Sequence, residues 1–343
     1  VEHKLGIHAS PTCVMSYEGA TAELVGRPNE GLAHMFVMMN AARLAVGVEG
    51  VGIAERAYQH ALAYGQERRQ GRSVWTGEMN APIIDHPDVR RMLSVMKAKV
   101  AAARAICLST AVAADLARTA ANDEDRLRWK GREDLFVPIA KAWSTDVGCE
   151  VASLGVQVHG GMGFIEETGA AQYYRDARIA PIYEGTNGVQ AMDLVGRKLS
   201  QDGGAAAKAL ITDMKATCGE LNRLYSGKPV ERLANAIEAV EDATLWLLDA
   251  KAEPARAADV LAAADAYLKL MGDVIGGWLL AKGALAAKAQ METGEGDAAW
   301  LQGRMDLYEV YAANVLGHAS SRLAAVGQGG ALLQRMTLDV LSA

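Results

Sequence analysis

Several features that mark particular classes of protein are scarce in this 343-residue sequence. Aromatic residues make up only 6% of it, which disfavours a sheet-rich fold because strands are enriched in aromatic and β-branched side chains. The net charge is −6 and the pI is near 5.7, which argues against a nucleic-acid-binding surface as the main function. No apolar run reaches the ~20 residues that a membrane-spanning helix needs. The sequence therefore predicts no nucleic-acid partner and no membrane span.

Cysteine and metal-binding patterns are also sparse. No histidine pair has H-x-x-x-H spacing, no Cys/His cluster has metal spacing, and no G-x-S-x-G motif is present. We therefore expect no metal and no catalytic nucleophile. The four cysteines are far apart and lie in or beside apolar stretches, so buried or free thiols of a reducing compartment are expected rather than disulfides. They are Cys13, Cys107, Cys149 and Cys218.

Helical periodicity is the main positive signal. Alanine and leucine are abundant, and from residue 31 onward apolar side chains recur at three- and four-residue steps, as they do on one face of a helix. Residues 120–134 are polar with mixed charge and are expected to form a loop. Three long helices and a shorter one with apolar stripes predict an antiparallel four-helix bundle. These predicted helices cover residues 31–71, 86 to beyond 116, 136–158 and 185–199.

Different patterns flank the predicted bundle. Residues 1–30 have the only strand character, with strands expected at 12–17 and 24–29. Residues 200–207 include Gly203 and Gly204 and are typical of a linker, and helical patterns return after it. We therefore divide the chain into residues 1–30, 31–199 and 200–343. The helices expected in the last part cover residues 207–224, 229–251, 254–291, 297–326 and 331–341.

The stretch I-A-P-I-Y-E-G-T-N-G-V-Q at 179–190 places one carboxylate, Glu184, between apolar and small residues. Gly185 removes side-chain bulk where another molecule could press on the backbone, and Thr186 or Asn187 is suited to cap the helix that follows. A carboxylate with apolar neighbours would lose solvation when covered and become a better general base. On these residues alone, Glu184 could equally cap a helix or lie in solvent.

Together with R-D-A-R at 175–178, this stretch resembles the active-site loop of acyl-CoA dehydrogenases, which read R-D-A-(K/R)-I-x-x-I-Y-E-G-T. In that family the loop glutamate removes the pro-R α-proton of an acyl-CoA thioester. The β-hydride passes to N5 of FAD, and the product is a trans-2-enoyl-CoA. The resemblance implies that Glu184 is the catalytic base. Isovaleryl and long-chain relatives place the base just before the residue corresponding to Arg43, where this sequence has Ala42.

Other family motifs are also present. R-R-Q-G-R at 68–72 resembles R-x-(T/Q)-F-G-(K/R), whose first Arg reaches the FAD pyrophosphate of the neighbouring subunit, although the Phe is absent here. Q-V-H-G-G-M-G at 157–163 matches the Q-x-x-G-G-x-G loop near the FAD adenosine. N-A-A-R at 40–43 corresponds to D-x-x-R, which lines the acyl-CoA cleft. Without the resemblance, a basic helix end and a glycine C-cap would explain the first two.

The resemblance thus implies two sets of binding residues. The substrate-binding set is Asn40, Arg43 and Gly185. The cofactor-binding set is Arg68, Gln70, His86, Gln157, Gly160, Gly161, Thr186, Asn187 and Gly188.

The family resemblance also implies an architecture. We expect a mainly α protein with the acyl-CoA dehydrogenase-type antiparallel four-helix bundle at residues 31–199. Residues 1–30 would be the end of a middle β-domain, so an N-terminal portion is expected to be missing. Residues 200–343 resemble the additional helical domain of a subgroup that includes the 3-methylmercaptopropionyl-CoA dehydrogenases.

The expected partners are an acyl-CoA substrate, an electron-transfer flavoprotein and further copies of the chain, as a homodimer or a dimer of dimers. The expected compartment is the bacterial cytoplasm, or the mitochondrial matrix in a eukaryote. Two alternatives remain at this point. One is an acyl-CoA oxidase, which passes electrons to O₂, and the other is a non-catalytic binding protein of the same fold.

Overall fold

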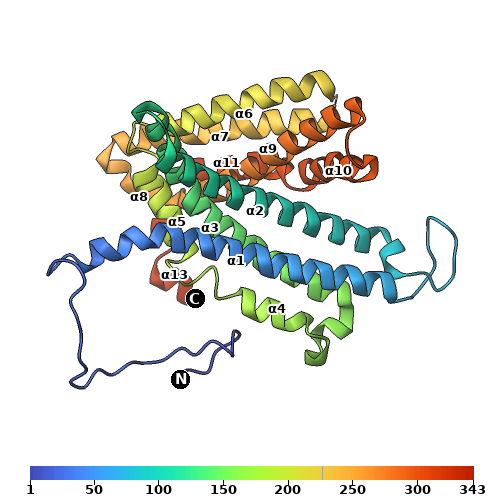
Figure 1. Ribbon diagram of the computed structural model, residues 1–343, viewed down its shortest axis with the longest axis horizontal. Helices are drawn as coiled ribbons and strands as arrows, with labels where there is room; N and C mark the ends of the chain where they lie inside the picture. Colours follow the sequence, from blue (N-terminus) through green and yellow to red (C-terminus); the bar gives the residue numbers. More distant parts are fainter. Residues whose placement is uncertain (226) are drawn as a thin grey trace.

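Helices make up most of the computed structural model, which describes residues 1–225 and 227–343 (Figure 1). Within these ranges no strand occurs, and the only β-pairing consists of two isolated bridges, Arg69 with Pro82 and Arg72 with Met79. Figure 1 shows two stacked groups of helices, with α1 to α4 below and α6 to α11 above. The mainly α class predicted from composition is confirmed.

The lower group contains three long helices. These are α1 (Gly31–Glu67), α2 (Pro87–Thr119) and α3 (Asp123–His159), and α3 packs against both α1 and α2. Pro87 is the first residue of α2, where its missing N–H costs nothing and its φ suits a helix. The predicted positions of α1 and α2 are correct within a few residues.

The crossing of α1 and α3 depends on glycine. A Cβ added at Gly47 would lie 2.6 Å from the carbonyl oxygen of Ala140, and one at Gly50 would lie 2.7 Å from that of Ser144. Carbon atoms do not approach carbonyl oxygens so closely, so the two backbones can meet here only because side chains are absent. The close crossing fixes α1 relative to α3, and both helices contribute to the candidate site described below.

The loop predicted at residues 120–134 is wrong, because α3 already begins at Asp123. Asn122 caps the helix by accepting a 2.8 Å hydrogen bond from the backbone N–H of Asp125, and an acidic first turn suits the helix dipole. Arg126 pairs with Asp123 at 3.0 Å one turn away. The polar, mixed-charge composition therefore belongs to an exposed stretch of helix rather than to a loop.

Short elements connect the ends of the bundle. The helix predicted at 185–199 is present, but it begins at Asn187 and its second half is a π-helical turn. Helix α4 was not predicted. The elements are η1 (Ile83–Asp85), η2 (Gly160–Phe164), η3 (Glu166–Thr168), α4 (Ala170–Ala177), α5 (Asn187–Asp193) and the π-helical η4 (Leu194–Lys198).

The upper group is entirely helical in the part of the chain that the structure describes. Its first two helices lie within two residues of their predicted positions. The elements are α6 (Ala205–Leu224), α7 (Lys228–Ala252), η5 (Pro254–Arg256), α8 (Ala257–Ala262), α9 (Ala264–Thr293), α10 (Ala298–Asn314), η6 (Leu316–His318), α11 (Ala319–Gly327), α12 (Ala331–Arg335) and α13 (Leu338–Ser342).

Two predicted long helices of the upper group are wrong because each is broken. The helix predicted over 254–291 is interrupted at Ala263, between α8 and α9. The helix predicted over 297–326 is interrupted at Val315, between α10 and η6. At the second break Leu316 is buried against α9, where a Cβ on Gly277 would be 2.8 Å from its side chain. Tertiary packing therefore accompanies the second of these breaks.

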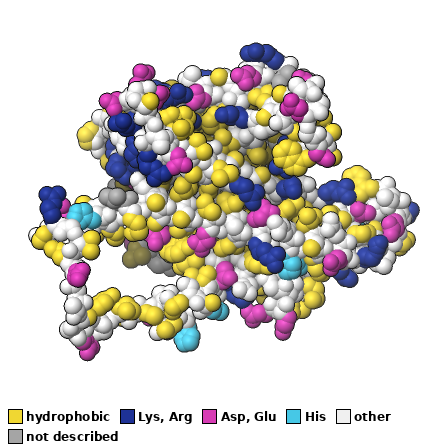
Figure 2. Space-filling model, in the orientation of Figure 1, with side chains coloured by type: hydrophobic (Ala, Val, Ile, Leu, Met, Phe, Trp, Pro, Cys, Tyr) yellow, Lys and Arg dark blue, Asp and Glu magenta, His cyan; other side chains and the backbone are white. Residues whose placement is uncertain are grey.

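The strands predicted within residues 1–30 are also wrong, because this segment has no regular secondary structure. A strand needs a neighbouring strand to satisfy its backbone groups, and the described ranges offer none. Figure 2 shows hydrophobic side chains along this exposed segment, and Val14 and Val25 are each 87% exposed. One attachment is clear: the backbone N–H of Ile7 donates a 2.5 Å hydrogen bond to Asp176 of α4.

The prediction that no apolar stretch reaches spanning length is wrong by helix length and composition. Helices α1, α2 and α9 are each long and apolar enough to cross a membrane by those criteria. In the structure, 67% of the most apolar window of α9 is buried, against 29% in α1 and 44% in α2. Burial in the core therefore explains the composition of α9. Helices α1 and α2 leave apolar surface exposed.

Candidate active site

The loop between α4 and α5 is fixed on both sides of Glu184. Before it, the hydroxyl of Tyr183 donates a hydrogen bond to Glu49 of α1. After it, the backbone N–H of Asn187 donates a 2.9 Å hydrogen bond to the carbonyl of Pro181 and closes the loop. Burial and the nearby Glu49 carboxylate raise the pKa of Tyr183, so this hydroxyl stays protonated. These contacts leave little freedom to the residues between them.

Glu184 has a strained backbone conformation. Its φ is +55°, and Gly185 follows with φ of +83°. A glycine adopts this left-handed region easily, whereas a residue with a Cβ pays on the order of 1 kcal/mol or more. The Glu184 side chain is exposed. Neighbouring structure thus holds one carboxylate outward, at a conformational cost, which is an arrangement often found at functional sites.

Two cations that pack against this loop bond to groups other than Glu184. Arg43 is buried on α1 and pairs with Asp193 of α5 at 3.3 Å, and Lys141 of α3 donates to Asn187 at 2.9 Å. Among the cavities described here, none reaches Glu184. The apolar cover expected over this carboxylate is therefore not provided by the described part of the chain, and it stays a prediction for the bound substrate.

The beginning of α5 is closely packed against α3. Thr186 caps α5 by accepting a 3.2 Å hydrogen bond from the backbone N–H of Val189, as predicted. The side-chain nitrogen of Asn187 donates to the carbonyl of Ala142 at 3.0 Å and to Asp146 at 2.8 Å. Because the Asn187 amide is used in this way and its backbone N–H bonds Pro181, both donors of Asn187 are engaged, and its cofactor contact stays a prediction.

Lys141 is a site residue that sequence analysis missed. It is 0% exposed in the middle of α3, and burial lowers its pKa to about 8. Asp146, Glu184 and Glu49 oppose this shift, while Arg43 adds to it. Its only sequence signal is one lysine within the apolar stretch F-V-P-I-A-K-A-W, which helical periodicity alone does not distinguish from a surface residue.

The two motif residues of α1 face different surroundings. Arg43 lies against α5, as described above. Asn40 lines a cavity of about 590 Å³ between α1, α2 and α3. The same cavity is lined by three basic side chains, Arg118, Arg126 and Lys130. Each of these cations pairs with a nearby carboxylate, namely Asp115, Asp123 and Glu133 respectively.

A second group of predicted residues meets at the opposite end of the bundle. Arg68, Gln70, Gly160 and Gly161 line one cavity of about 680 Å³. The guanidinium of Arg68 donates to the side chain of Gln70 at 3.3 Å. A ring nitrogen of His86 lies 2.7 Å from the carbonyl oxygen of Gln70. The cluster therefore brings together residues from three separate stretches of the sequence.

The remaining predicted residues have simpler positions. Gln157 is exposed near the end of α3, and its carbonyl accepts from the N–H of Gly160, which is the C-cap. Gly160 has φ of +59° with open space around it. Gly188 is exposed on the first turn of α5 with room for a ligand beside it. None of these positions blocks the predicted contacts.

His159 lies in the wall of the 680 Å³ cavity and was not singled out from the sequence. It is 3% exposed, and its ring stacks on Tyr64 with centroids 4.4 Å apart. Its Nδ1 bonds the carbonyl of Gly155 at 2.7 Å, whereas its Nε2 is buried without a partner among the described residues. An orphaned ring nitrogen is what a missing polar ligand would leave. The cavity thus fits a polar cofactor.

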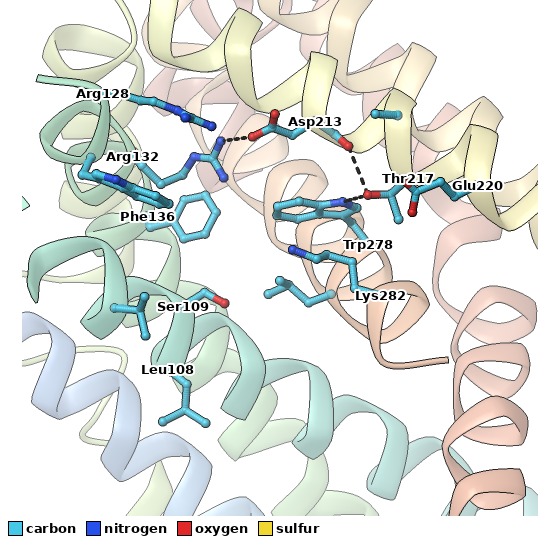
Figure 3. A pocket seen from close by; sticks show the side chains of 14 residues that line it. Leu108, Ser109, Arg128, Arg132, Phe136, Asp213, Thr217, Glu220, Trp278 and Lys282 are labelled. Atoms are coloured by element: carbon cyan, nitrogen blue, oxygen red, sulfur yellow. Dashed lines mark hydrogen bonds and ion pairs between the residues drawn. The ribbon is translucent and has the colours of Figure 1, made fainter. Parts of the chain in front are cut away.

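A third cavity, of about 580 Å³, lies between α2, α3, α6 and α9 (Figure 3). Its polar groups largely satisfy one another. Arg132 pairs with Asp213 at 2.6 Å, and the indole N–H of Trp278 donates to Thr217 at 2.8 Å. Lys282 lies over the Trp278 ring. The Arg132–Asp213 pair connects α3 of the lower group with α6 of the upper group, and no predicted site residue lines this cavity.

The remaining points concern metal ligands and thiols. Within residues 1–225 and 227–343, no three His, Cys, Asp or Glu side chains form a group that could hold a metal ion. All four cysteines are free thiols, as expected. Burial raises the pKa of Cys107 to about 11, which leaves it an unreactive thiol at neutral pH.

Comparison with known proteins gives a consistent result. Two protein-family models match the chain, "Acyl-CoA dehydrogenase, C-terminal domain" over residues 29–199 and "Acetyl-CoA dehydrogenase C-terminal like" over residues 210–337. A 3-methylmercaptopropionyl-CoA dehydrogenase from Ruegeria pomeroyi is 47% identical over 94% of this chain and 54% of its own length. The broad-specificity linear acyl-CoA dehydrogenase FadE5 of Mycobacterium tuberculosis is 31% identical over 92% of this chain and 54% of its own.

Solved structures share the fold. ACDH-11 of Caenorhabditis elegans in complex with C11-CoA matches 92% of this chain and 49% of its own, with a TM-score of 0.74 and 21% identity. An acyl-CoA dehydrogenase complexed with FAD from Bacillus anthracis matches 98% of this chain and 57% of its own, with a TM-score of 0.68 and 23% identity. This chain spans about half the length of the curated relatives just named. The chain belongs to the acyl-CoA dehydrogenase family.

Proposed function

We propose that the protein containing this chain catalyses the FAD-dependent α,β-dehydrogenation of an acyl-CoA thioester to the trans-2-enoyl-CoA. One observation carries the proposal: in a chain of this family, Glu184 is held exposed in a left-handed conformation between anchors on α1 and α3. Such strain persists only where the surroundings impose it. An outward carboxylate on a rigid loop suits a base that must meet a substrate carbon.

In this mechanism Glu184 removes the α-proton. Its backbone N–H donates a hydrogen bond to the thioester carbonyl and makes that proton more acidic. Bound FAD supplies the acceptor for the β-hydride. Gly185 keeps the backbone accessible beside the base. Covering the loop with substrate removes water from the carboxylate and strengthens it as a base.

Asn40 and Arg43 would both line the acyl-CoA cleft, but from different positions. Asn40 lines the cavity that also contains Arg118, Arg126 and Lys130. CoA carries several phosphate groups, which would bind these cations in exchange for their present carboxylate partners. Arg43 acts from a different position, because it is buried against Asp193. It would therefore shape the cleft beside Glu184 rather than pair with a phosphate.

The cofactor would be held by residues from both ends of the bundle. The cavity lined by Arg68, Gln70, Gly160 and Gly161, with the orphaned Nε2 of His159, suits the phosphate and adenosine part of FAD. His86 and Gln157 flank this cavity, and Thr186, Asn187 and Gly188 lie near the base.

Lys141 and His159 are 18 residues apart on α3, or about 27 Å along its axis. This separation supports a homodimer, or a dimer of dimers, in which one subunit's cavity completes the other's site.

The base assignment is tested by Glu184→Gln in the full-length protein. The variant should bind FAD and remain yellow, whereas acyl-CoA should no longer bleach the flavin, because an amide cannot accept the α-proton. Anaerobic stopped-flow absorbance with acyl-CoAs of increasing length, including 3-methylmercaptopropionyl-CoA, measures this and locates the preferred substrate. Bleaching by the variant at the wild-type rate would exclude Glu184 as the base.

The proposed electron acceptor is an electron-transfer flavoprotein. A dehydrogenase should reduce that partner and form little hydrogen peroxide in air. Stoichiometric peroxide during turnover would instead indicate an acyl-CoA oxidase. Acyl-CoA binding without any flavin reduction would indicate a non-catalytic binding protein of this fold.

A further inference from the structure

The first observation concerns the buried ammonium of Lys141. It lies under the Glu184 loop, is 0% exposed, and donates a 2.9 Å hydrogen bond to the side-chain oxygen of Asn187. Burying an ammonium is costly unless it is bonded and faces negative charge. Here Asp146, Glu49 and Glu184 provide that charge, and Arg43 is the opposing cation. If Lys141 served only to fill space, Met or Leu could do so without the free-energy cost of burying a charge.

The second observation is that the Asn187 amide is held from both sides, with Lys141 bonding its oxygen. The Asn187 nitrogen donates to the carbonyl of Ala142 at 3.0 Å and to the carboxylate of Asp146 at 2.8 Å. Both are acceptors, so the amide oxygen must face the opposite side, where it needs a donor. Lys141 is that donor, with Thr145 as a longer second contact at 3.4 Å.

The third observation connects Asn187 to the base. Asn187 is the first residue of α5 and lies three positions after Glu184. Its backbone N–H closes the loop onto Pro181 at 2.9 Å. A shift of Asn187 therefore moves the chain that holds Glu184 at φ of +55°. The strained conformation would relax if this end of the loop were released.

We infer that Lys141 is a positioning residue for Glu184 and acts through the side chain of Asn187. The ammonium holds the Asn187 amide, the amide holds the first turn of α5, and that turn holds the loop carrying the base. Lys141 does not touch the substrate in this scheme. The inference rests on the proposed function, since it assigns a role within that reaction.

The test measures flavin reduction by acyl-CoA in single turnovers of the full-length protein. Lys141→Met should slow flavin reduction at least tenfold, with little change in the substrate concentration that gives half the maximal rate. Lys141→Gln, which can still donate a hydrogen bond to Asn187, should recover a substantial part of the rate. Lys99→Met is the matched control, because Lys99 bonds Glu150 at 2.6 Å outside the site, and it should leave the rate unchanged.

A double-mutant cycle with Asn187→Ala tests the route of the effect. If Lys141 acts through Asn187, Lys141→Met should slow the Asn187→Ala protein by less than twofold. Fully independent effects, which multiply in the double variant, would overturn the inference. Circular dichroism and flavin content verify that each variant is folded.

The outcomes separate the two proposals. If Glu184→Gln abolishes bleaching while Lys141→Met reacts like the wild type, the positioning role is wrong and the proposed function stands. If the wild-type protein binds FAD but no acyl-CoA bleaches it, the proposed function itself fails. If Lys141→Gln is as slow as Lys141→Met, positioning through a hydrogen bond is wrong.

Discussion

At the scale of single residues, the candidate site combines an exposed carboxylate with a buried ammonium. Glu184 is held outward by its loop, while Lys141 lies within α3 and bonds Asn187. The two charges interact, since Glu184 is among the groups that raise the Lys141 pKa against the effect of burial. A change of charge on Glu184 should therefore affect the Lys141 ammonium, and a change of charge on Lys141 should affect the Glu184 carboxylate, because coupling between two groups is reciprocal.

The Lys141 pKa predicts a pH dependence of stability. Burial lowers this pKa from the ordinary value of 10.5 to about 8. Between these values the unfolded chain binds more protons than the folded one, so Lys141 makes the free energy of unfolding rise with pH. Below pH 8 both states are protonated and the burial cost is fully present. The Lys141→Met variant has no amine to titrate at this position. Its free energy of unfolding, relative to that of the wild type, should therefore fall by up to about 3 kcal/mol between pH 8 and 10.5.

Urea unfolding at pH 7.5 and pH 10 measures this change. Lys99→Met should differ from the wild type by the same amount at both pH values, because Lys99 is partly exposed and is paired with Glu150. A stability difference for Lys141→Met that does not change with pH would show that the buried amine is not what titrates in this range.

The residues of the site differ in how far the sequence could reveal them. Glu184, Arg68 and Gly160 belong to short motifs whose letters are specific, so their positions could be predicted, although their roles remain proposals. Lys141 and His159 carry no such signal. Burial of a lysine in a helix, or an orphaned nitrogen in a cavity wall, depends on which other helices pack there. Sequence periodicity does not contain that information.

At the scale of helices, α1 and α3 carry the anchors of the site and touch at glycines. Glu49, which holds Tyr183, is adjacent to Gly50, where α1 lies against the carbonyl of Ser144. The spacing of these backbones therefore determines how far Glu49 reaches. Helix contacts of this kind tolerate no added methyl group without a shift of the backbone.

Gly50→Ala should destabilise the protein by about 1–3 kcal/mol, because the new Cβ would be 2.7 Å from the Ser144 carbonyl oxygen. Gly52→Ala is the matched control two residues along. No atom lies within 4 Å of its added Cβ, and alanine favours a helix over glycine by up to about 1 kcal/mol. Chemical denaturation followed by far-UV circular dichroism compares them. If Gly50→Ala and Gly52→Ala changed the free energy of unfolding by the same amount and in the same direction, the proposed close contact at Gly50 would be contradicted.

Helix ends were predicted well where local signals exist and poorly where they do not. Pro87 marks the start of α2 and Gly160 the end of α3, and both were found. The break at Ala263 has neither glycine nor proline, so only packing reveals it. Residues 120–134 show the opposite error, because Asn122 is a good N-cap that the polar composition obscured.

At the scale of the whole molecule, one buried carboxylate connects the two groups of helices. Asp273 of α9 is 4% exposed and accepts a 2.9 Å hydrogen bond from the indole N–H of Trp143 on α3. It also pairs with Arg322 of α11 at 2.5 Å. Burial raises the Asp273 pKa, and Arg322 and Trp143 oppose that shift. The charge is therefore tolerated only while its partners remain.

Removing Arg322 should weaken this connection strongly. Arg322→Met leaves the Asp273 carboxylate buried without its cation, and an uncompensated buried charge costs about 3–5 kcal/mol at neutral pH. The loss should diminish as pH falls, because the raised pKa lets the folded state bind a proton that the unfolded state does not yet bind. Guanidinium unfolding at pH 5 and pH 7.5 measures this change.

Two further variants separate the charge effect from simple loss of an arginine. Arg104→Met removes a half-exposed partner of Glu55 and should cost no more than about 1 kcal/mol. Arg322→Met combined with Asp273→Asn removes both charges, and it should be more stable than Arg322→Met alone because no buried charge remains. If the double variant is less stable than the single one, the connection depends on the shape of these side chains and not on charge compensation.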